Sequence, residues 1–182
     1  MIDPLHFESF MRDYQNMVFT TAFRLVGNAS EAEDIAQEVF LKAYEHFEDL
    51  SLSPTAGGWL KTVTRNLSLN HLTRYRARWR FFSEMRSEEG DDGGGYEADI
   101  PAPDTHGQAM DNADQKQILE AALQKLPAAQ RVPLVLYHFE NLSYEEIAEK
   151  LKVSLGKVKT DIHRGRETLR RKLTPHLADA VC

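Results

Sequence analysis

The chain has 182 residues, a formal net charge of −6 and a hydrophobic fraction of 42%, which suits one large or two small packed domains. Its single cysteine, Cys182, excludes an internal disulfide framework and a cysteine-rich zinc site. No apolar run is long enough to cross a bilayer and the N-terminal residues lack a signal-peptide pattern, so we expect a cytoplasmic protein without membrane insertion.

The net charge hides a strong segregation of charge along the chain. Residues 61–80 contain six Lys or Arg and no acid, whereas residues 83–114 contain ten Asp or Glu and a single Arg. Because the cations are concentrated in separate zones, the mildly acidic average does not exclude binding to nucleic acid.

Two helices are predicted in the first fifty residues. Residues 6–26 carry apolar side chains at helical spacing and stop at Gly27. Ser30 and Glu33 have the spacing of a capping box, which predicts that a second helix starts there and runs to about residue 47. The outer face of this helix is acidic, and charge alone leaves open whether it is solvated or docks a partner.

A third helix is predicted over residues 59–82, after turn-forming residues at 48–58. Its far end interleaves aromatic side chains with cations. That combination suits single-stranded nucleic acid, because cations follow phosphates and aromatic rings stack on unpaired bases. Trp59 is expected to pack in the core. Gly, Pro and acids dominate residues 83–112, which predicts a flexible acidic linker.

The second half of the chain ends in a helix pair over residues 142–173. Ser143 and Glu146 form a second capping-box pattern, and Ser154 can cap the helix that follows. This second helix carries a dense row of cations, as expected of a helix-turn-helix whose recognition helix lies in the DNA major groove. A merely solvated basic helix is the alternative, but it does not explain why the cations coincide with the caps and the turn.

Two further helices, over residues 118–126 and 128–139, precede this pair. The elements therefore predict an all-α protein of two small helical domains joined by the acidic linker. The N-terminal domain would have three to four helices and the C-terminal domain four. The predicted units are residues 1–82, the linker 83–112, residues 113–175 and a tail of residues 176–182.

Residues suited to catalysis or metal binding are scattered. The seven histidines show no metal-ligand spacing, and the glycines at 93–95 lie in an acidic run that would repel phosphate. Glu145 and Glu146 are adjacent acids, but they lie in the first turn of a helix, where capping explains them. We therefore expect neither an enzyme nor a cofactor or metal site.

Three stretches together resemble bacterial sigma factors of the extracytoplasmic-function class. They are AEDIAQEVFLKAY at 32–44, WLKTVTRNLSLNHL at 59–72 and the sequence of residues 126–173, in matching order and spacing. The resemblance covers the chain apart from the linker and the tail. It implies a non-enzymatic subunit that binds core RNA polymerase and promoter DNA and directs promoter-specific initiation. Relatives are commonly held inactive by an anti-sigma factor, which we expect as a further partner.

The resemblance also implies three contact surfaces. The first domain would dock on the polymerase and capture the melted minus-ten element, and the second would read the minus-thirty-five duplex. The implied polymerase contacts are Asp34, Gln37, Glu38 and Leu41. The implied minus-ten contacts are Lys61, Arg65, Asn66, Asn70, Arg74 and Arg76. The implied minus-thirty-five contacts are Ser154, Gly156, Lys157, Lys159, Thr160, His163, Arg164 and Arg166.

Some positions depart from the family pattern. Asp161 stands where many relatives carry a cation, so we expect its carboxylate to repel phosphate or to accept a hydrogen bond from cytosine. Lys152 takes a turn position that often holds Gly, and the loop at 53–58 lacks an aromatic residue that relatives often place there. A stand-alone helix-turn-helix regulator is the alternative function, and a module that sequesters a partner is a third.

Overall fold

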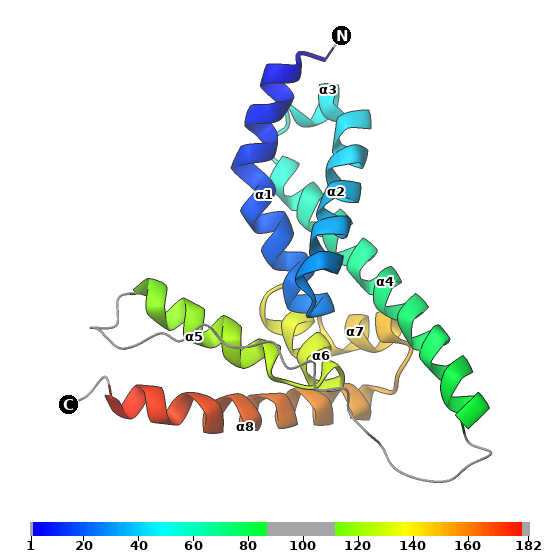
Figure 1. The fold of residues 1–182 in the computed structure, drawn as a ribbon, viewed down its shortest axis with the longest axis vertical. Helices are drawn as coiled ribbons and strands as arrows, with labels where there is room; N and C mark the ends of the chain where they lie inside the picture. Colours follow the sequence, from blue (N-terminus) through cyan, green and yellow to red (C-terminus); the bar gives the residue numbers. More distant parts are fainter. Residues whose placement is uncertain (1, 87–111, 180–182) are drawn as a thin grey trace.

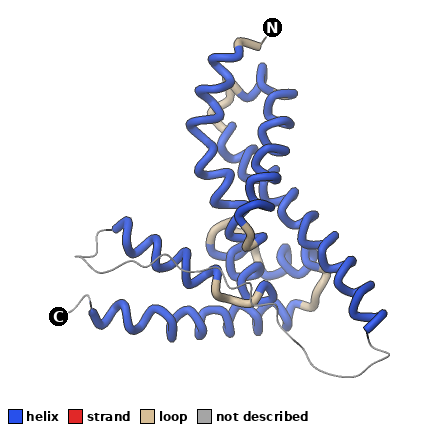
Figure 2. The backbone as a smooth tube through the Cα atoms, in the orientation of Figure 1, coloured by secondary structure: helices blue, strands red, loops and turns tan. Residues whose placement is uncertain are grey.

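The computed structural model describes residues 2–86 and 112–179, and all regular structure within these two ranges is α-helical (Figures 1 and 2). The predicted all-α fold is therefore confirmed. No helix of the described residues is both long and apolar enough to span a membrane. Most of the predicted acidic linker lies outside the described residues.

The first group of helices comprises α1 (Pro4–Val26), α2 (Ala29–Glu45), the short α3 (Phe47–Leu50) and α4 (Ala56–Arg86). In Figure 1, α1, α2 and the first half of α4 lie side by side. Their apolar faces share a core that includes Val18, Ala22, Val39 and Leu60, all fully buried. Trp59, near the start of α4, is partly buried and packs against this core, as predicted.

The boundaries of these helices differ from the predictions, and three of the differences matter for the argument. Asn28, not Ser30, caps α2, because its side chain accepts a hydrogen bond from the amide of Glu31. The region predicted as turn contains α3, whose Phe47 and Leu50 are buried. Helix α4 begins at Ala56 and continues to Arg86, beyond the predicted end at residue 82.

The second group comprises α5 (Asn112–Gln124), α6 (Ala128–His138), α7 (Tyr144–Leu151) and α8 (Leu155–Asp179). The predicted capping box is present at the start of α7, where Ser143 and Glu146 bond each other's backbone amides. Lys152 ends α7 in the left-handed conformation, with φ 55° and ψ 46°. A non-glycine residue in that conformation costs about 1 kcal/mol.

The two groups of helices pack against each other. Helix α1 contacts both α5 and α6. Leu25 of α1 and Leu69 of α4 belong to the same buried cluster as Val135 of α6 and Ile162 of α8. In the described residues, the predicted domains therefore share an apolar core, and the end of α1 meets α6 at the junction seen in Figure 1.

Candidate nucleic-acid interface

The helix pair α7–α8 presents a basic outer face. Ile147, Val158 and Ile162 bury the inner faces of the two helices, and the Ser154 hydroxyl caps α8 by accepting from the amide of Lys157 at 3.2 Å. This packing turns the opposite face of α8 to solvent. All eight residues predicted for the minus-thirty-five element are exposed: Ser154, Gly156, Lys157, Lys159, Thr160, His163, Arg164 and Arg166.

Arg166 is nevertheless held against α6. Its Nε atom donates to Nε2 of His138 at 3.1 Å, and its guanidinium lies 5.4 Å from the ring centroid of Tyr137. Burial, and then the charge of Arg166, lowers the pKa of His138. The neutral form that can accept this hydrogen bond is thereby favoured.

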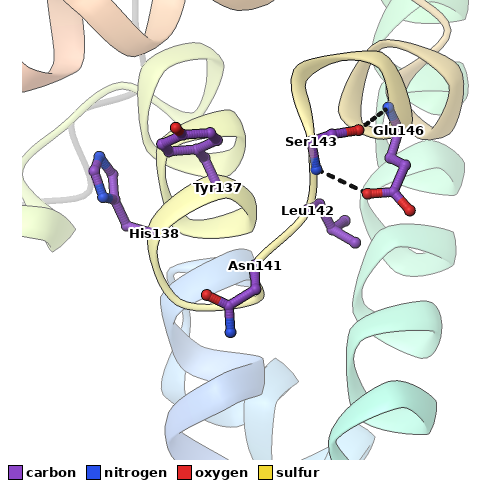
Figure 3. Close-up of a pocket in the computed structure, with 6 residues that line it drawn as sticks. All are labelled: Tyr137, His138, Asn141, Leu142, Ser143 and Glu146. Atoms are coloured by element: carbon purple, nitrogen blue, oxygen red, sulfur yellow. Dashed lines mark hydrogen bonds between the residues drawn. The ribbon is translucent and has the colours of Figure 1, made fainter.

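The same part of α6 borders an open hollow of about 500 Å³ between α6 and α7 (Figure 3). Glu146 lies at its edge with its carboxylate turned to the backbone amide of Ser143, at 2.8 Å. That hydrogen bond is the main reason why the pKa of Glu146 is lowered. The carboxylate is thus committed to capping α7, as the sequence predicted.

Asp161 does not lie on the exposed face of α8, where a contact with DNA was expected. Its side chain lies on the buried side of α8, at a relative exposure of 9%, and one carboxylate oxygen is 2.6 Å from Nζ of Lys157. Because the carboxylate is turned toward the protein, it is not placed to meet a cytosine in the groove. The carboxylate instead pairs with Lys157, one helical turn earlier, and holds its ammonium against the surface of α8.

Replacing Asp161 with Asn is expected to free Lys157 for a phosphate contact. The logarithm of the affinity for duplex DNA should then fall more steeply with the logarithm of salt concentration, by about 0.9 for one added contact. Fluorescence anisotropy across a salt series measures this slope. Glu167→Gln, which removes an equal charge from the Glu167–Arg170 pair on the same helix, is the control. Equal slopes for Asp161→Asn and the wild-type protein would contradict the expectation.

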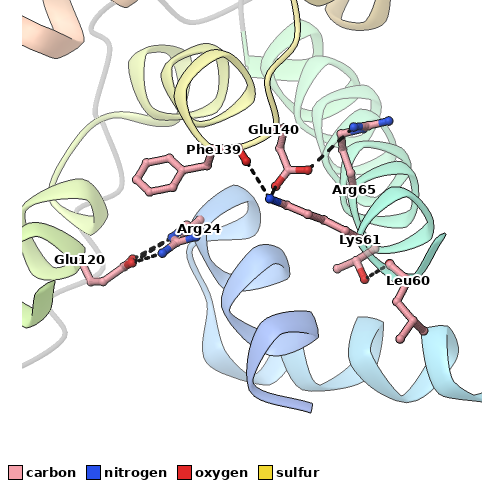
Figure 4. A network of polar contacts seen from close by, with 8 residues as sticks. Arg24, Leu60, Lys61, Arg65, Glu120, Phe139 and Glu140 are labelled. Carbon is pink, nitrogen blue, oxygen red and sulfur yellow. Dashed lines mark hydrogen bonds and ion pairs between the residues drawn. The ribbon is translucent and has the colours of Figure 1, made fainter. Parts of the chain in front are cut away.

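Helix α4 carries the residues predicted for the minus-ten element. Asn66, Asn70 and Arg74 are exposed on it, whereas the side chain of Arg76 lies outside the described side chains. Lys61 and Arg65 are partly buried, and both are turned toward the end of α6 (Figure 4).

Their partner is Glu140, a residue that the sequence analysis did not single out. Nζ of Lys61 and Nη1 of Arg65 each lie 3.8 Å from a Glu140 carboxylate oxygen. Lys61 also donates to the carbonyl oxygen of Phe139 at 2.8 Å. Burial raises the pKa of Glu140, although Lys61 and Arg65 oppose that rise. A single acid after an apolar helix is a weak sequence signal for an ion pair with another helix.

Most of the acidic face of α2 is exposed, although Glu31 is half-buried and lies against His71. The residues predicted to contact polymerase, Asp34, Gln37, Glu38 and Leu41, are all exposed. Leu41 is 68% exposed, and Tyr44, one turn further along α2, is 46% exposed. Leu41 therefore offers an apolar contact beside the carboxylates of α2, a combination suited to a docking surface.

Comparison with known families separates the two groups of helices in the same way. Residues 10–79 match the family "Sigma-70 region 2", and residues 116–169 match "Sigma-70, region 4". The first match accounts for α1, α2 and most of α4, which a stand-alone helix-turn-helix regulator would not need. That alternative therefore has no support.

Similar proteins cover nearly the whole chain. The ECF RNA polymerase sigma factor SigW of Bacillus subtilis is 32% identical over 88% of this chain and 84% of its own. The sigma-H factor of Pseudomonas aeruginosa is also 32% identical, over 98% of this chain and 91% of its own. SigE of Mycolicibacterium smegmatis is 34% identical over 96% of this chain and 64% of its own.

The fold is also found in a solved structure. The sigma factor RpoE of Bartonella quintana, crystallised with the anti-sigma factor NepR, aligns with a TM-score of 0.52 at 23% identity, over 92% of this chain and 96% of that one. The chain belongs to the extracytoplasmic-function sigma factors, non-enzymatic subunits that bind core RNA polymerase and direct promoter-specific initiation of transcription.

Proposed function

We propose that this sigma factor reads its promoter with two helices and docks on polymerase with a third. Helix α8 enters the major groove of the minus-thirty-five element, α4 follows the melted minus-ten strand, and α2 binds the polymerase. The observation that carries the proposal is the exposed basic face on α8, directly after a capped helix and a tight turn. The corresponding functional units are residues 1–82 and 113–175, with the linker at 83–112 and a tail at 176–182.

The start of α8 suits the backbone of duplex DNA. Ser154 and Gly156 are exposed at the N-terminus of the helix, where free amides and the helix dipole favour a phosphate. A Cβ atom added to Gly156 would meet nothing within 4 Å, so this end of the helix is open to an approaching strand. Lys159 and Arg164 follow on the exposed face, at positions suited to guanine edges or phosphates.

The middle of α4 suits a strand that has left the duplex. Asn66 and Asn70 are one helical turn apart and exposed, with Arg74 one turn further on. Amide side chains can hydrogen-bond to the edge of an extruded base, and the arginine can pair with a phosphate. Extruding a base costs a few kcal/mol, which these contacts must offset.

The α2 face can be tested separately from DNA. Leu41→Ala is expected to weaken binding to core polymerase by about 1–3 kcal/mol, because a buried leucine at an interface contributes roughly that much. Leu5→Ala, on α1, is the matched control, since Leu5 is 75% exposed. Surface plasmon resonance with immobilised core polymerase gives both affinities. If Leu41→Ala binds like Leu5→Ala, α2 is not the docking face.

A protein inhibitor and a cytoplasmic location complete the proposal. The structurally similar RpoE was crystallised with an anti-sigma factor. An inhibitor of this class is proposed for the present chain because α2 and α8 both leave recognition surfaces exposed. We propose a cytoplasmic location, because the protein acts with core RNA polymerase.

A further inference from the structure

We infer that Arg166 is a fixed phosphate contact at the edge of the minus-thirty-five element, and that His138 and Tyr137 position its guanidinium for that contact. The inference rests on the proposed function, in which α8 lies in the major groove. It adds two positioning residues that lie on α6, outside the helix pair α7–α8.

Arg166 lies on the part of α8 that is expected to leave the groove. It follows Lys159 by seven residues, so the two side chains lie on the same side of the helix, about 10 Å apart along its axis. Recognition helices contact base edges with their N-terminal residues. A cation two turns further along is therefore expected to meet the phosphate backbone rather than the bases.

The guanidinium of Arg166 is held by groups without a formal charge. Its Nε atom donates to Nε2 of His138 at 3.1 Å, and its central carbon lies 5.4 Å from the centre of the Tyr137 ring. Partial burial, and then the charge of Arg166, lowers the pKa of His138, so the neutral imidazole is favoured. These contacts fix the guanidinium without cancelling its charge.

Other cations of α8 are paired with carboxylates of the same helix. Nζ of Lys157 lies 2.6 Å from an oxygen of Asp161. Nη2 of Arg170 lies 3.2 Å from an oxygen of Glu167. By contrast, no acid of the described residues pairs with Arg166, and its hydrogen bond to α6 uses only the Nε–H group. The N–H groups of both Nη atoms therefore remain available, and they can bind two oxygens of one phosphate.

Neighbouring aromatic rings restrain the two residues that hold Arg166. The Tyr137 ring lies 4.8 Å from that of Tyr144 on α7, at an interplanar angle of 22°. It also meets the His138 ring edge-on, at 5.0 Å and 90°. Figure 3 shows Tyr137 and His138 at the end of α6, beside the hollow between α6 and α7. Contacts from two helices thus limit the movement of the guanidinium on the third.

A guanidinium that is already in place loses less freedom when it binds a phosphate. Immobilising a flexible side chain at an interface lowers the affinity, so positioning by α6 should raise it. Phosphate contacts carry no sequence information, but they fix the register of the protein on the duplex. The gain should therefore be similar for every base sequence.

The phosphate contact is tested with the full chain bound to core polymerase and a fluorescent duplex that this complex selects from a random-sequence library. Arg166→Gln should weaken binding about tenfold and reduce the slope of log affinity against log salt concentration by about 0.9, for one lost phosphate contact. Arg12→Gln, in the exposed Arg12–Glu8 pair of α1, is the control. Wild-type affinity and slope for Arg166→Gln would overturn the inference, even if its unfolding midpoint falls.

The positioning role of His138 is tested by removing and then restoring its acceptor. His138→Leu should weaken binding about three- to tenfold, the effect of immobilising one long side chain. His138→Gln supplies an amide oxygen and should bind like the wild-type protein, and His176→Leu, at an exposed histidine of α8, is the control. In the Arg166→Gln background, His138→Leu should have no further effect. A further loss there, or a failure of His138→Gln to restore binding, would overturn the positioning role.

Two comparisons keep the remaining outcomes distinct. Tyr137→Phe keeps the ring face and should bind like the wild-type protein, whereas Tyr137→Leu should not; equal affinities would remove Tyr137 from the inference. Lys159→Ala and Arg164→Ala are measured on the same duplex. If they weaken binding but Arg166→Gln does not, the inference fails while the reading helix stands. If none of these three substitutions weakens binding, the proposed function of α8 fails as well.

Discussion

Replacing Lys159 or Arg164 with alanine is expected to weaken binding to a minus-thirty-five duplex by about 1–3 kcal/mol each, if each side chain contacts a base. Both residues are exposed on α8, and neither side chain is held by an ion pair or hydrogen bond within the described residues. Their loss should therefore leave the fold intact and remove only contacts to DNA.

The measurement is fluorescence anisotropy with the wild-type duplex and with single base-pair changes. A base contact predicts that the penalty for the substitution disappears on the changed base pair, whereas a phosphate contact predicts the same penalty on every duplex. Lys125→Ala removes an exposed cation at the end of the α5 region and is the control. If Lys159→Ala and Arg164→Ala bind like Lys125→Ala, α8 is not the reading helix.

Replacing Arg131 with methionine is expected to lower the free energy of unfolding by about 3 kcal/mol. Arg131 is 7% exposed, and its guanidinium serves three carbonyl oxygens. Burial lowers the pKa of this group, which shows that holding it in the interior has a cost of its own. That cost reduces the benefit of the bonds, but methionine leaves the acceptors without a donor, at about 1–3 kcal/mol for each buried unsatisfied group.

Urea denaturation followed by circular dichroism gives the free energy, with Arg12→Met as the control for an exposed arginine on α1. The control is expected to change stability by less than about 0.5 kcal/mol. If Arg131→Met changes the free energy of unfolding by less than this amount, the cap that Arg131 provides for the end of α1 contributes little.

The local signals in the sequence correctly predicted the helix pair. Ser143 with Glu146, Ser154 and the apolar stripe of α7 and α8 act over a few residues, so the sequence carries all the information needed. The wrong prediction of Ser30 as the cap of α2 also concerns neighbouring residues only. Asn28 and Ser30 are both good caps, and Gly27 ends α1 so closely before them that Asn28 takes the position.

Asp161 could have been placed more accurately from its spacing. It lies three residues after Val158 and four before Gly165, both of which are buried, and so belongs to the inner face of α8. Its pairing with Lys157 at four residues' distance follows from the same geometry. The resemblance to other sigma factors concerns the charge at position 161, whereas helical periodicity determines which way the side chain points.

The contacts between the domains were beyond the reach of local patterns. Glu140 and Arg131 find their partners in the other domain more than seventy residues away in the sequence. A lone cation inside the apolar run of α6 is a signal that Arg131 is buried, but not of what it binds. Sequence periodicity predicts which faces are apolar, and here the end of α1 and the middle of α4 present apolar residues that only the packed structure pairs with α6 and α8.

Transcription of genomic DNA from the source bacterium by core polymerase, with and without this protein, tests the central claim most directly. Sequencing of the 5′ ends should reveal starts that depend on the protein and share two upstream elements. Lys159→Ala and Arg164→Ala should reduce these starts in proportion to their loss of duplex affinity. A core polymerase that initiates at the same positions with and without the protein would contradict the account.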